Sequence, residues 1–335
     1  MKHPKTALAM ATDLPGRLFT EASCEQLCRV ADVDPGVVLT EFQSPGARAA
    51  LARAEVLLTG WSCPPVDESA LAAAPNLRAI VHAGGSVKGH VTPACWERGI
   101  LVSTAAEANS QPVAEYTVAM ILLAGKSAHL IERRYRQRRA GLHVRTEFPQ
   151  IGNYGRTVGV VGASRIGRRV IALLRPFDLN VIVSDPYLDA DGARQLGVQM
   201  AELDDLLRGS DIVTLHAPSL PSTHHLLDRR RLGLMRDGAT LINTARGALV
   251  DQAALVDELV AGRLNAVLDV TDPWVLPTDS PLYDLPNVVL TPHIAGALGV
   301  ELRRLGASAI AELERYARGE PFQHPVTRAE LDRIA

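Results

Sequence analysis

Residues 157–185, TVGVVGASRIGRRVIALLRPFDLNVIVSD, constrain the fold more than any other segment of the chain. A short apolar run leads into a glycine-containing turn, a helical pattern follows, and a second apolar run ends at Asp185. Gly162 allows a sharp exit from the first strand, and Gly167 allows the helix to pack closely against it. The helix that begins near Arg165 directs its free N–H groups and its dipole toward an anion. The segment therefore predicts a dinucleotide-binding strand–helix–strand unit.

Two residues of this unit refine the prediction. A carboxylate at position 185 is placed to accept hydrogen bonds from the adenosine ribose, and it repels the 2′-phosphate of NADP. We therefore expect NAD(H) as the cofactor. Ser164 stands where the usual motif has its middle glycine, so its Cβ crowds the approach of the phosphates, although its hydroxyl can donate a hydrogen bond to one of them. We expect weaker or slightly displaced cofactor binding, but not its loss.

Apolar runs bounded by turn residues alternate with helical patterns along nearly the whole chain, which is typical of an α/β protein with parallel sheets. In the first part we expect strands over 7–10, 55–58, 78–82 and 100–102, and helices over 21–31 and 45–53. One long helix is expected from Gln111 to about Ala140, with Pro112 in its first turn.

A second series of strands follows this helix. The expected strands are 157–161, 180–184, 211–216, 240–243, 266–270 and 288–290. Six strands in this order fit a complete doubly wound nucleotide domain. A last amphipathic helix is expected over 300–318, because Gly319 and Pro321 terminate the pattern.

Size and charge limit the class of protein. A chain of 335 residues exceeds what one hydrophobic core usually supports, which favours two domains. The 35 basic and 37 acidic residues leave a net charge of −2, so neither nucleic acid nor a membrane is expected as a partner. The basic run over 133–139 is interpreted as the solvated end of the long helix, with a polyanion site as the less favoured alternative.

The cysteines and the hydropathy pattern bear on metal binding and compartment. Cys24, Cys28, Cys63 and Cys95 lack zinc-site spacing, so we expect reduced, buried thiols and no metal. The N-terminus lacks the apolar core of a signal peptide, and no apolar run reaches membrane-spanning length. The expected location is the cytoplasm.

Three further segments carry a resemblance to a known family. Residues 103–118 (STAAEANSQPVAEYTV), 216–251 (HAPSLPSTHHLLDRRRLGLMRDGATLINTARGALVD) and 287–296 (NVVLTPHIAG) resemble the D-isomer-specific 2-hydroxyacid dehydrogenases, which include phosphoglycerate dehydrogenase-like enzymes. The resemblance implies an NAD-dependent oxidoreductase that transfers a hydride between nicotinamide and a 2-hydroxy or 2-keto acid, or a similar small anion such as a phosphonate.

The resemblance also implies an architecture. It predicts two similar Rossmann/flavodoxin-like domains with doubly wound parallel sheets, an active site in the cleft between them, and a homodimer held through the nucleotide domains. The substrate domain would contain residues 1–107 and 300–335, and the NAD-binding domain would contain residues 108–299.

The resemblance assigns the two catalytic residues and a substrate loop. Arg246 would hold the substrate carboxylate and polarise the adjacent carbonyl, and His293 would exchange a proton with the carbonyl oxygen. Backbone amides of the loop HAGGSVKGH would bind the substrate through Gly84, Gly85, Ser86 and Val87. Lys88 replaces an acidic residue common in relatives; it would suit a substrate with a second anionic group, or it is simply a solvated lysine.

The cofactor-binding set implied by the motifs is larger. It consists of Asn109, Gly162, Ser164, Arg165, Ile166, Gly167, Asp185, Ala217, Pro218, Thr223, Thr244, Ala245, Asp269, Ala295 and Gly296. Within it, Asn109 resembles a residue at the hinge and cofactor edge, Thr223 is expected near the adenosine, and Asp269 has the family role of facing the nicotinamide carboxamide.

One family residue is missing. Relatives usually read DVFxxEP, with a glutamate that pairs with the catalytic histidine, whereas residues 269–277 read DVTDPWVLP and place Trp274 there. A histidine without a carboxylate partner titrates nearer its free pKa of about 6.5 and is held less firmly. Three interpretations remain. Asp272 or Asp269 orients His293, or Trp274 walls a specialised pocket in an active enzyme, or catalysis is lost and NAD(H) binding has a regulatory or scaffold role.

Overall fold

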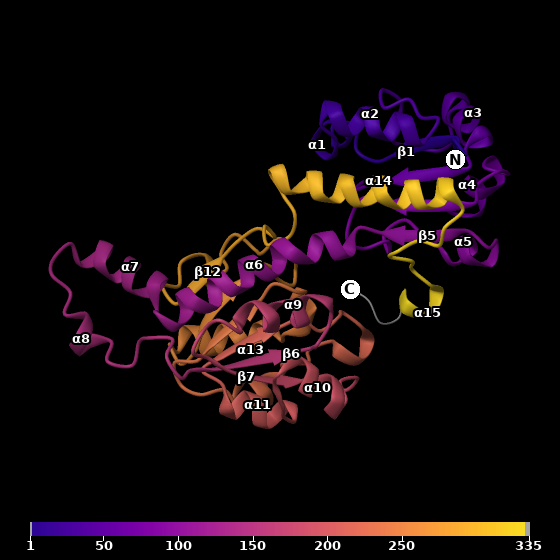
Figure 1. Cartoon of the computed structure of the whole chain (residues 1–335). Helices are drawn as coiled ribbons and strands as arrows, with labels where there is room; N and C mark the ends of the chain where they lie inside the picture. Colours follow the sequence, from indigo (N-terminus) through magenta and orange to yellow (C-terminus); the bar gives the residue numbers. More distant parts are fainter. Residues whose placement is uncertain (1, 332–335) are drawn as a thin grey trace. The chain divides into compact units, whose positions relative to one another are not determined.

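The computed structural model describes residues 2–331 and divides the chain into two compact α/β units (Figure 1). Unit 1 contains the residues up to Ser110 and those from Ala297 onward, and unit 2 contains Gln111–Gly296. Residues 108–110 and 297–299 thus belong to unit 1 and not to the nucleotide domain in which the sequence placed them. Residues 332–335 of the expected substrate domain lie outside the described residues.

Unit 1 is a five-stranded parallel sheet with helices on both faces. The strand order is β2-β1-β3-β4-β5, with β1 (Thr6–Ala9), β2 (Val38–Leu39), β3 (Val56–Thr59), β4 (Ala79–His82) and β5 (Leu101–Thr104). One face packs against α1 (Leu14–Leu18), α2 (Glu21–Val30) and α14 (Leu302–Arg318), which follows the short η4 (Gly299–Glu301). The other face packs against α3 (Pro45–Arg53), α4 (Glu68–Ala73) and α5 (Pro93–Glu97).

Unit 2 is a seven-stranded parallel sheet that is also covered on both faces. The order β12-β11-β10-β9-β6-β7-β8 joins β6 (Thr157–Val161), β7 (Asn180–Ser184), β8 (Gln199–Met200), β9 (Ile212–Leu215), β10 (Thr240–Asn243), β11 (Asn265–Leu268) and β12 (Val288–Leu290). One face carries α6 (Ala106–Gly125), α9 (Arg165–Leu174) and α10 (Ala190–Leu196), and the other carries α11 (Leu203–Gly209), α12 (Arg229–Leu232) and α13 (Gln252–Val260). The expected α/β class with two doubly wound parallel sheets is confirmed.

The strand register of unit 2 brings the expected site residues to one edge of the sheet. Val161 is aligned with Leu215, Leu215 with Asn243, Asn243 with Leu268, and Leu268 with Leu290. Each of these residues ends or nearly ends its strand, so the loops that follow emerge side by side. The strand order reverses at β6, between β7 and β9, which is where doubly wound sheets bind their ligands.

The prediction of one long helix is wrong in two respects. The segment forms two helices, α6 and α7 (Ala128–Arg138), because Ser127 adopts a left-handed conformation with φ 49° and breaks the repeat. The helix also begins before Gln111, so Pro112 lies inside α6 and not in its first turn. Apolar spacing continued through the break, and a serine there gave no turn signal.

Two short strands and two cysteines also differ from expectation. The sequence did not predict β2 and β8, each of which is two residues long and lies at a sheet edge. Cys63 and Cys95 are buried, but Cys28 is exposed and Cys24 is only partly covered. Both lie on α2, where Leu27 and Val30 are the buried residues; Cys24 packs against the edge of this core, and Cys28 faces the solvent.

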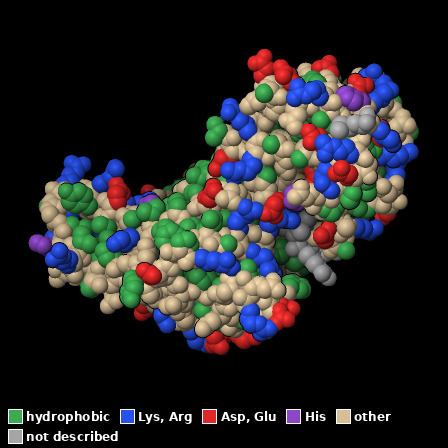
Figure 2. Space-filling view, in the orientation of Figure 1, with side chains coloured by type: hydrophobic (Ala, Val, Ile, Leu, Met, Phe, Trp, Pro, Cys, Tyr) green, Lys and Arg blue, Asp and Glu red, His purple; other side chains and the backbone are tan. Residues whose placement is uncertain are grey.

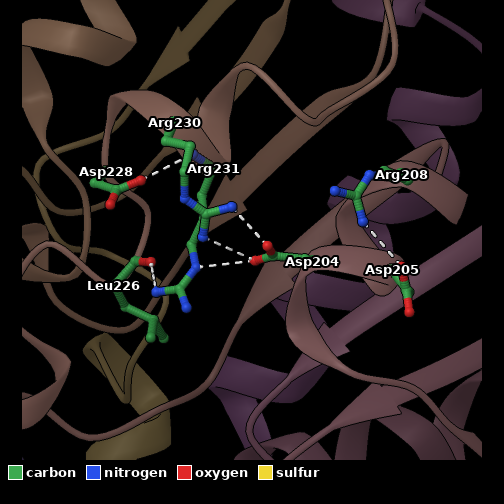
Figure 3. A network of polar contacts seen from close by, with 7 residues as sticks. All are labelled: Asp204, Asp205, Arg208, Leu226, Asp228, Arg230 and Arg231. Carbon is green, nitrogen blue, oxygen red and sulfur yellow. Dashed lines mark hydrogen bonds and ion pairs between the residues drawn. The ribbon is translucent and has the colours of Figure 1, made fainter.

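An ion-pair network holds the segment that follows β9 (Figure 3). Asp204 at the start of α11 accepts hydrogen bonds from Arg230 at 2.6 and 3.1 Å and from Arg231 at 3.2 Å. Arg231 also donates to the carbonyl of Leu226 at 2.9 Å, and Asp228 caps α12. The hydrogen bonds from Arg230 hold the pKa of Asp204 low, at about 2. The network anchors α12 to α11 and so fixes the far end of the β9 loop.

The surface carries charges of both signs. Figure 2 shows basic and acidic side chains interspersed over the visible face, while hydrophobic side chains gather around α6 and α7. In the described range, 2–331, no helix is long and apolar enough to cross a bilayer.

Candidate functional site

The glycine turn after β6 has the geometry that the sequence required. Gly162 has φ +98°, and a Cβ at this position would lie 2.7 Å from the backbone nitrogen of Ala217. A Cβ at Gly167 would overlap the carbonyl oxygen of Gly162, so the first turn of α9 packs directly on the strand exit. Neither position therefore tolerates a side chain without moving the backbone. The turn leaves a small cradle at the switch point of the sheet.

Ser164 is the N-cap of α9. Its Oγ accepts a hydrogen bond from the backbone N–H of Gly167 at 3.4 Å, and its own backbone is extended. The hydroxyl proton is not used in this cap, so it remains able to donate to an anion. Ile166 lies half-buried in the first helical turn. The serine thus serves as the cap of this helix end.

Asp185 follows β7 and is tied to the same turn. Its Oδ2 accepts from the backbone N–H of Ala163 at 2.6 Å, and its Oδ1 accepts from that of Tyr187 at 2.7 Å. Each carboxylate oxygen keeps a further lone pair for a ribose hydroxyl. The carboxylate is therefore held in one orientation before any ligand arrives.

The loop after β9 supplies the other wall of the turn. Ala217 is buried against Gly162, and the carbonyl of Pro218 accepts a hydrogen bond from Thr223 Oγ1 at 2.6 Å. Thr223 Oγ1 also accepts from the N–H of Leu220 at 2.9 Å, so this side chain closes its own turn. His216, whose pKa burial lowers to about 3, is a neutral packing residue.

Arg246 emerges from a turn after β10 that a neighbouring asparagine organises. Asn243 donates to the carbonyl of Arg246 at 2.9 Å and accepts from the N–H of Ala245 at 3.1 Å. The guanidinium is partly buried; its Nη1 donates to the carbonyl of Ala245 at 2.7 Å, and burial lowers its pKa. The adjacent Thr244 is buried and shares a hydrogen bond with Thr117 of α6 at 2.9 Å. Arg246 is therefore a fixed, poorly solvated cation.

Asp269 holds the loop that carries His293. The side chain is 1% exposed, and its carboxylate accepts from the hydroxyl of Thr291 at 2.7 Å and from the backbone N–H groups of Ile294 and Ala295 at 2.8 and 2.9 Å. Its carbonyl accepts from the N–H of His293 at 2.9 Å. His293 has φ +56°, a left-handed conformation that this set of bonds sustains.

The imidazole of His293 is orientated by an aromatic contact. Its ring centroid lies 4.7 Å from that of Trp274, with the planes tilted by 46°. Nδ1 is buried and has no hydrogen-bond partner among residues 2–331. Burial lowers the pKa of His293 below 6.5, the charge of Arg246 lowers it further, and Asp269 opposes both.

The first of the three interpretations of Trp274 holds for the backbone but not for the ring: Asp269 fixes the loop that carries His293, whereas neither aspartate bonds the imidazole. The carboxylate of Asp269 is engaged by Thr291 and two amides, so it acts on the imidazole itself through its charge and not through a hydrogen bond. Asp272 is exposed, and its backbone N–H donates to Gln252 at 2.9 Å. Within the described part of the chain, neither aspartate forms a hydrogen bond with the imidazole. The sequence could not show which groups these aspartates bond, because that depends on how the loops after β11 and β12 run in space.

A hydrogen-bond chain that the sequence did not reveal ends on Asp269. The hydroxyl of Tyr116 in α6 lies 3.0 Å from Thr291 Oγ1, which itself lies 2.7 Å from Asp269 Oδ1. The carboxylate can only accept here, so Thr291 donates to it, and Tyr116 must donate to Thr291. Burial raises the pKa of Tyr116, which keeps this donor protonated. The sequence shows a tyrosine directly after Ala114 and Glu115, but it does not show that this tyrosine bonds Thr291.

The glycine loop of unit 1 presents a row of backbone amides. Thr104 Oγ1 lies within hydrogen-bond distance of the carbonyls of Gly84 and Gly85, at 2.9 and 2.8 Å, and Val87 is buried in the core. The loop residues are Gly84, Gly85, Ser86 and Val87, and none of their N–H groups donates to an acceptor in residues 2–331. The carbonyls are thus fixed, and the amides are left for an anion.

Two buried histidines lie beside this loop. Thr59 Oγ1 bonds His82 Nδ1 at 2.9 Å and His90 Nε2 at 3.0 Å, and a Cβ at Gly84 would overlap the His82 ring. Burial lowers the pKa of His90 to about 4 and that of His82 well below its usual value, so both are neutral at pH 7. The loop therefore relies on amides and not on a buried cation.

Asn109 lies in unit 1, where its Oδ1 accepts from the N–H of Ala297 at 3.0 Å and its amide faces Gly85. It fastens the start of α6 to the returning chain. Ala295 is buried, and Gly296 is the last residue of unit 2. Among residues 2–331, no group of three or more His, Cys, Asp or Glu side chains is arranged to hold a metal ion.

Known proteins resemble the chain over most of its length. The family model described as "D-isomer specific 2-hydroxyacid dehydrogenase, NAD binding domain" matches residues 118–295. D-3-phosphoglycerate dehydrogenase of Mycobacterium leprae is 38% identical over 277 residues, which are 82% of this chain and 51% of that protein. Glyoxylate reductase of Korarchaeum cryptofilum is 32% identical over 76% of this chain and 78% of its own length.

A solved structure agrees with these sequence matches. The TT0316 protein from Thermus thermophilus is 30% identical, with a TM-score of 0.76 over 96% of this chain and 99% of that one. The chain spans about half the length of the D-3-phosphoglycerate dehydrogenases that it matches.

Proposed function

The chain belongs to the D-isomer-specific 2-hydroxyacid dehydrogenase family, and its residues 118–295 match the NAD-binding domain of that family. We therefore propose that it interconverts a small 2-keto acid and the corresponding 2-hydroxy acid. The observation that supports this best is the pairing of a fixed arginine and a proton-exchanging histidine at one sheet edge. Arg246 follows β10 and His293 follows β12, and the ends of these strands are aligned through β11. The charge of Arg246 also lowers the pKa of His293.

The residues at the switch point fit NAD(H). The cradle at Gly162 and Gly167 would be filled by any Cβ, and the first turn of α9 directs amides and a serine hydroxyl into it. Asp185 would accept hydrogen bonds from the adenosine ribose. NADH, when bound, supplies the hydride, and NAD⁺ accepts it in the reverse direction.

The chain's own residues would carry the other parts of the reaction. Arg246 binds the substrate carboxylate and polarises the neighbouring carbonyl, because its guanidinium is fixed and poorly solvated. As the hydride reaches C2, His293 donates a proton to the carbonyl oxygen, which becomes the hydroxyl. Oxidation reverses both transfers, and neutral His293 then accepts the proton. In unit 1, the amides at 84–87 would hold a carboxylate.

One observation favours a second candidate function. His293 has an aromatic neighbour where relatives provide a carboxylate, and its Nδ1 has no hydrogen-bond partner among the described residues. A chain that binds NAD(H) without turnover would have a regulatory or scaffold role. The hydrogen bonds that fix the Arg246 turn and the Asp269 loop favour the enzyme.

Steady-state assays separate the two candidates. NADH consumption is measured with a panel of 2-keto acids and phosphonates, alongside NADH binding by fluorescence. Arg246→Ala should abolish turnover and leave NADH binding within about threefold, since the arginine contacts the substrate. Normal NADH binding by the parent with no turnover of any compound would establish the non-catalytic function.

The cofactor assignment has its own variant. Asp185→Ala removes the carboxylate that repels a 2′-phosphate, so the preference for NADH over NADPH should fall by at least about tenfold. Tyr187→Ala, an exposed neighbour in the same turn, serves as the control. An unchanged preference would contradict the role of Asp185.

We also propose a homodimer formed through unit 2. The helices α7 and α8 (Val144–Glu147) contain no buried residue and project from the sheet in Figure 1. Tyr135, which lies in α7, and Tyr154, which follows α8, are 59% and 88% exposed. A second copy would cover these rings. Light scattering should give a dimer mass, and Tyr135→Glu combined with Tyr154→Glu should give a monomer.

A further inference from the structure

A cavity of about 450 Å³ opens in unit 2 beside His293. It lies between the loop after β11, the short η3 (Pro281–Tyr283), β12 and the helix α7. This volume is within the usual range for sites that enclose a small molecule, about 300–1,000 Å³. The methyl group of a three-carbon keto acid would leave most of it empty.

The walls of the cavity are mainly apolar and partly aromatic. Trp274, Val275 and Tyr283 line it, although they are 65%, 74% and 48% exposed. Leu276, Leu290 and Pro292 complete the apolar lining. Large apolar side chains that stay exposed next to a catalytic residue indicate a surface that is covered when a ligand binds. Because Trp274 also contacts the His293 ring, a group bound here would lie next to the reacting centre.

Arg133 of α7 adds a cation to this lining. Its Nη1 donates to the carbonyl of Leu285 at 2.7 Å, and within residues 2–331 it forms no ion pair. A guanidinium has five N–H donors, so this contact leaves several unused. The carboxylate of Asp269, which also lines the cavity, is occupied by Thr291 and two backbone amides. The cavity therefore combines an aromatic surface with an available donor.

We propose that this cavity binds the side group of the substrate and that this group is an aromatic ring with a hydrogen-bond acceptor, such as a phenolic oxygen. The ring would pack against Trp274, and the acceptor would bind Arg133. The inference rests on the proposed function, because His293 must act on the 2-keto acid to which the ring is attached. It also gives Trp274 a role in place of the missing carboxylate, which is to select the substrate.

Substrate selectivity tests the proposal. With NADH, kcat/KM for 4-hydroxyphenylpyruvate should exceed kcat/KM for pyruvate and for 3-phosphohydroxypyruvate by at least about a hundredfold, the scale of several buried ring carbons. Trp274→Ala should lower the ratio of 4-hydroxyphenylpyruvate to pyruvate by at least about tenfold. Phe177→Ala removes an exposed aromatic side chain outside this cavity and should leave the ratio unchanged.

Arg133 is tested by a second comparison. Arg133→Gln should lower the ratio of 4-hydroxyphenylpyruvate to phenylpyruvate by about fivefold or more, because only the first carries the acceptor. Arg136→Gln, on the same helix but outside the lining, is the matched control. Preference for pyruvate or the phosphorylated acid, or an equal loss for all acids in Trp274→Ala, would overturn the proposal.

Calorimetry distinguishes failure of this inference from failure of the proposed function. If no 2-keto acid is reduced, the titration of 4-hydroxyphenylpyruvate into the NADH complex is decisive. Binding that Trp274→Ala weakens by about tenfold or more would support the cavity in a protein without turnover. Absence of binding, or binding that Trp274→Ala does not affect, would overturn it.

Discussion

The indole of Trp274 lies 4.7 Å, centroid to centroid, from the imidazole of His293, at the position where the motif DVFxxEP led us to expect a carboxylate. An aromatic ring restricts the imidazole by packing, but it contributes no negative charge. The protonated form of His293 is therefore less favoured here than beside a glutamate. Burial and Arg246 lower the pKa of His293 in the same direction.

A carboxylate at position 274 should raise the pKa of His293. In the parent, keto-acid reduction needs protonated His293, so kcat/KM should fall as pH rises through a pKa below 6.5. Trp274→Glu places a negative charge near the ring. We expect the pH at which kcat/KM falls to increase by about 1–3 pH units. Trp274→Gln is the neutral control. Equal profiles for the glutamate and glutamine variants would show that the charge does not reach His293.

Removal of one hydroxyl group should weaken the support of the His293 loop. Tyr116→Phe leaves Thr291 without its donor, which costs about 0.5–1.5 kcal/mol and corresponds to a kcat decrease of about twofold to tenfold. The KM for NADH should stay constant. The pH at which kcat/KM falls should shift, because the Asp269 charge that acts on His293 is less firmly placed. Thr117→Val, which removes a nearby hydroxyl bonded to Thr244, is the control. A decrease in thermal stability with an unaltered pH profile would reduce Tyr116 to a packing residue.

Ser164 should weaken NADH binding through its Cβ and stabilise helix α9 through its hydroxyl cap. Ser164→Gly removes the Cβ that crowds the phosphates, while a glycine N-cap costs only a few tenths of a kcal/mol. We expect NADH to bind several-fold more tightly, with almost the same Tm. Ser164→Ala keeps the Cβ and loses the cap, so it should lower stability by about 1 kcal/mol without tighter binding. Weaker NADH binding by the glycine variant would show that the serine hydroxyl itself holds a phosphate.

Buried neutral histidines should make the protein sensitive to acid. The folded-state pKa values of His90 and His216 are lowered by burial to about 4 and about 3, below the unfolded value near 6.5. Between these limits the unfolded chain binds more protons, so stability is complete above about pH 6.5 and decreases as pH falls toward 4 and 3. Denaturant melts from pH 7.5 to 4.5 measure this slope. His90→Gln should flatten it, whereas the exposed His143→Gln should not.

The parts of the molecule that the sequence predicted are those determined by local rules. Gly162, Gly167 and Asp185 could be placed because strand, turn and helix follow one another within a single segment. The relation of Trp274 to His293 was inferred as a missing partner, but its ring contact depends on two loops that meet only in space. The bonds of Asp269 to residues 291–295 were hidden for the same reason. The break at Ser127 was missed because hydrophobic periodicity does not report a left-handed residue.

Asp269 supports the loop of His293, while the side chain of Trp274 packs against its ring. The scaffold that places this histidine is thus separate from the group that modulates its acidity. Because of this division, substitutions at position 274 can change the pKa of His293 and the substrate preference while the backbone around the reacting nitrogen stays in place. A saturation library at this one position should therefore contain mostly folded variants with widely different pH optima.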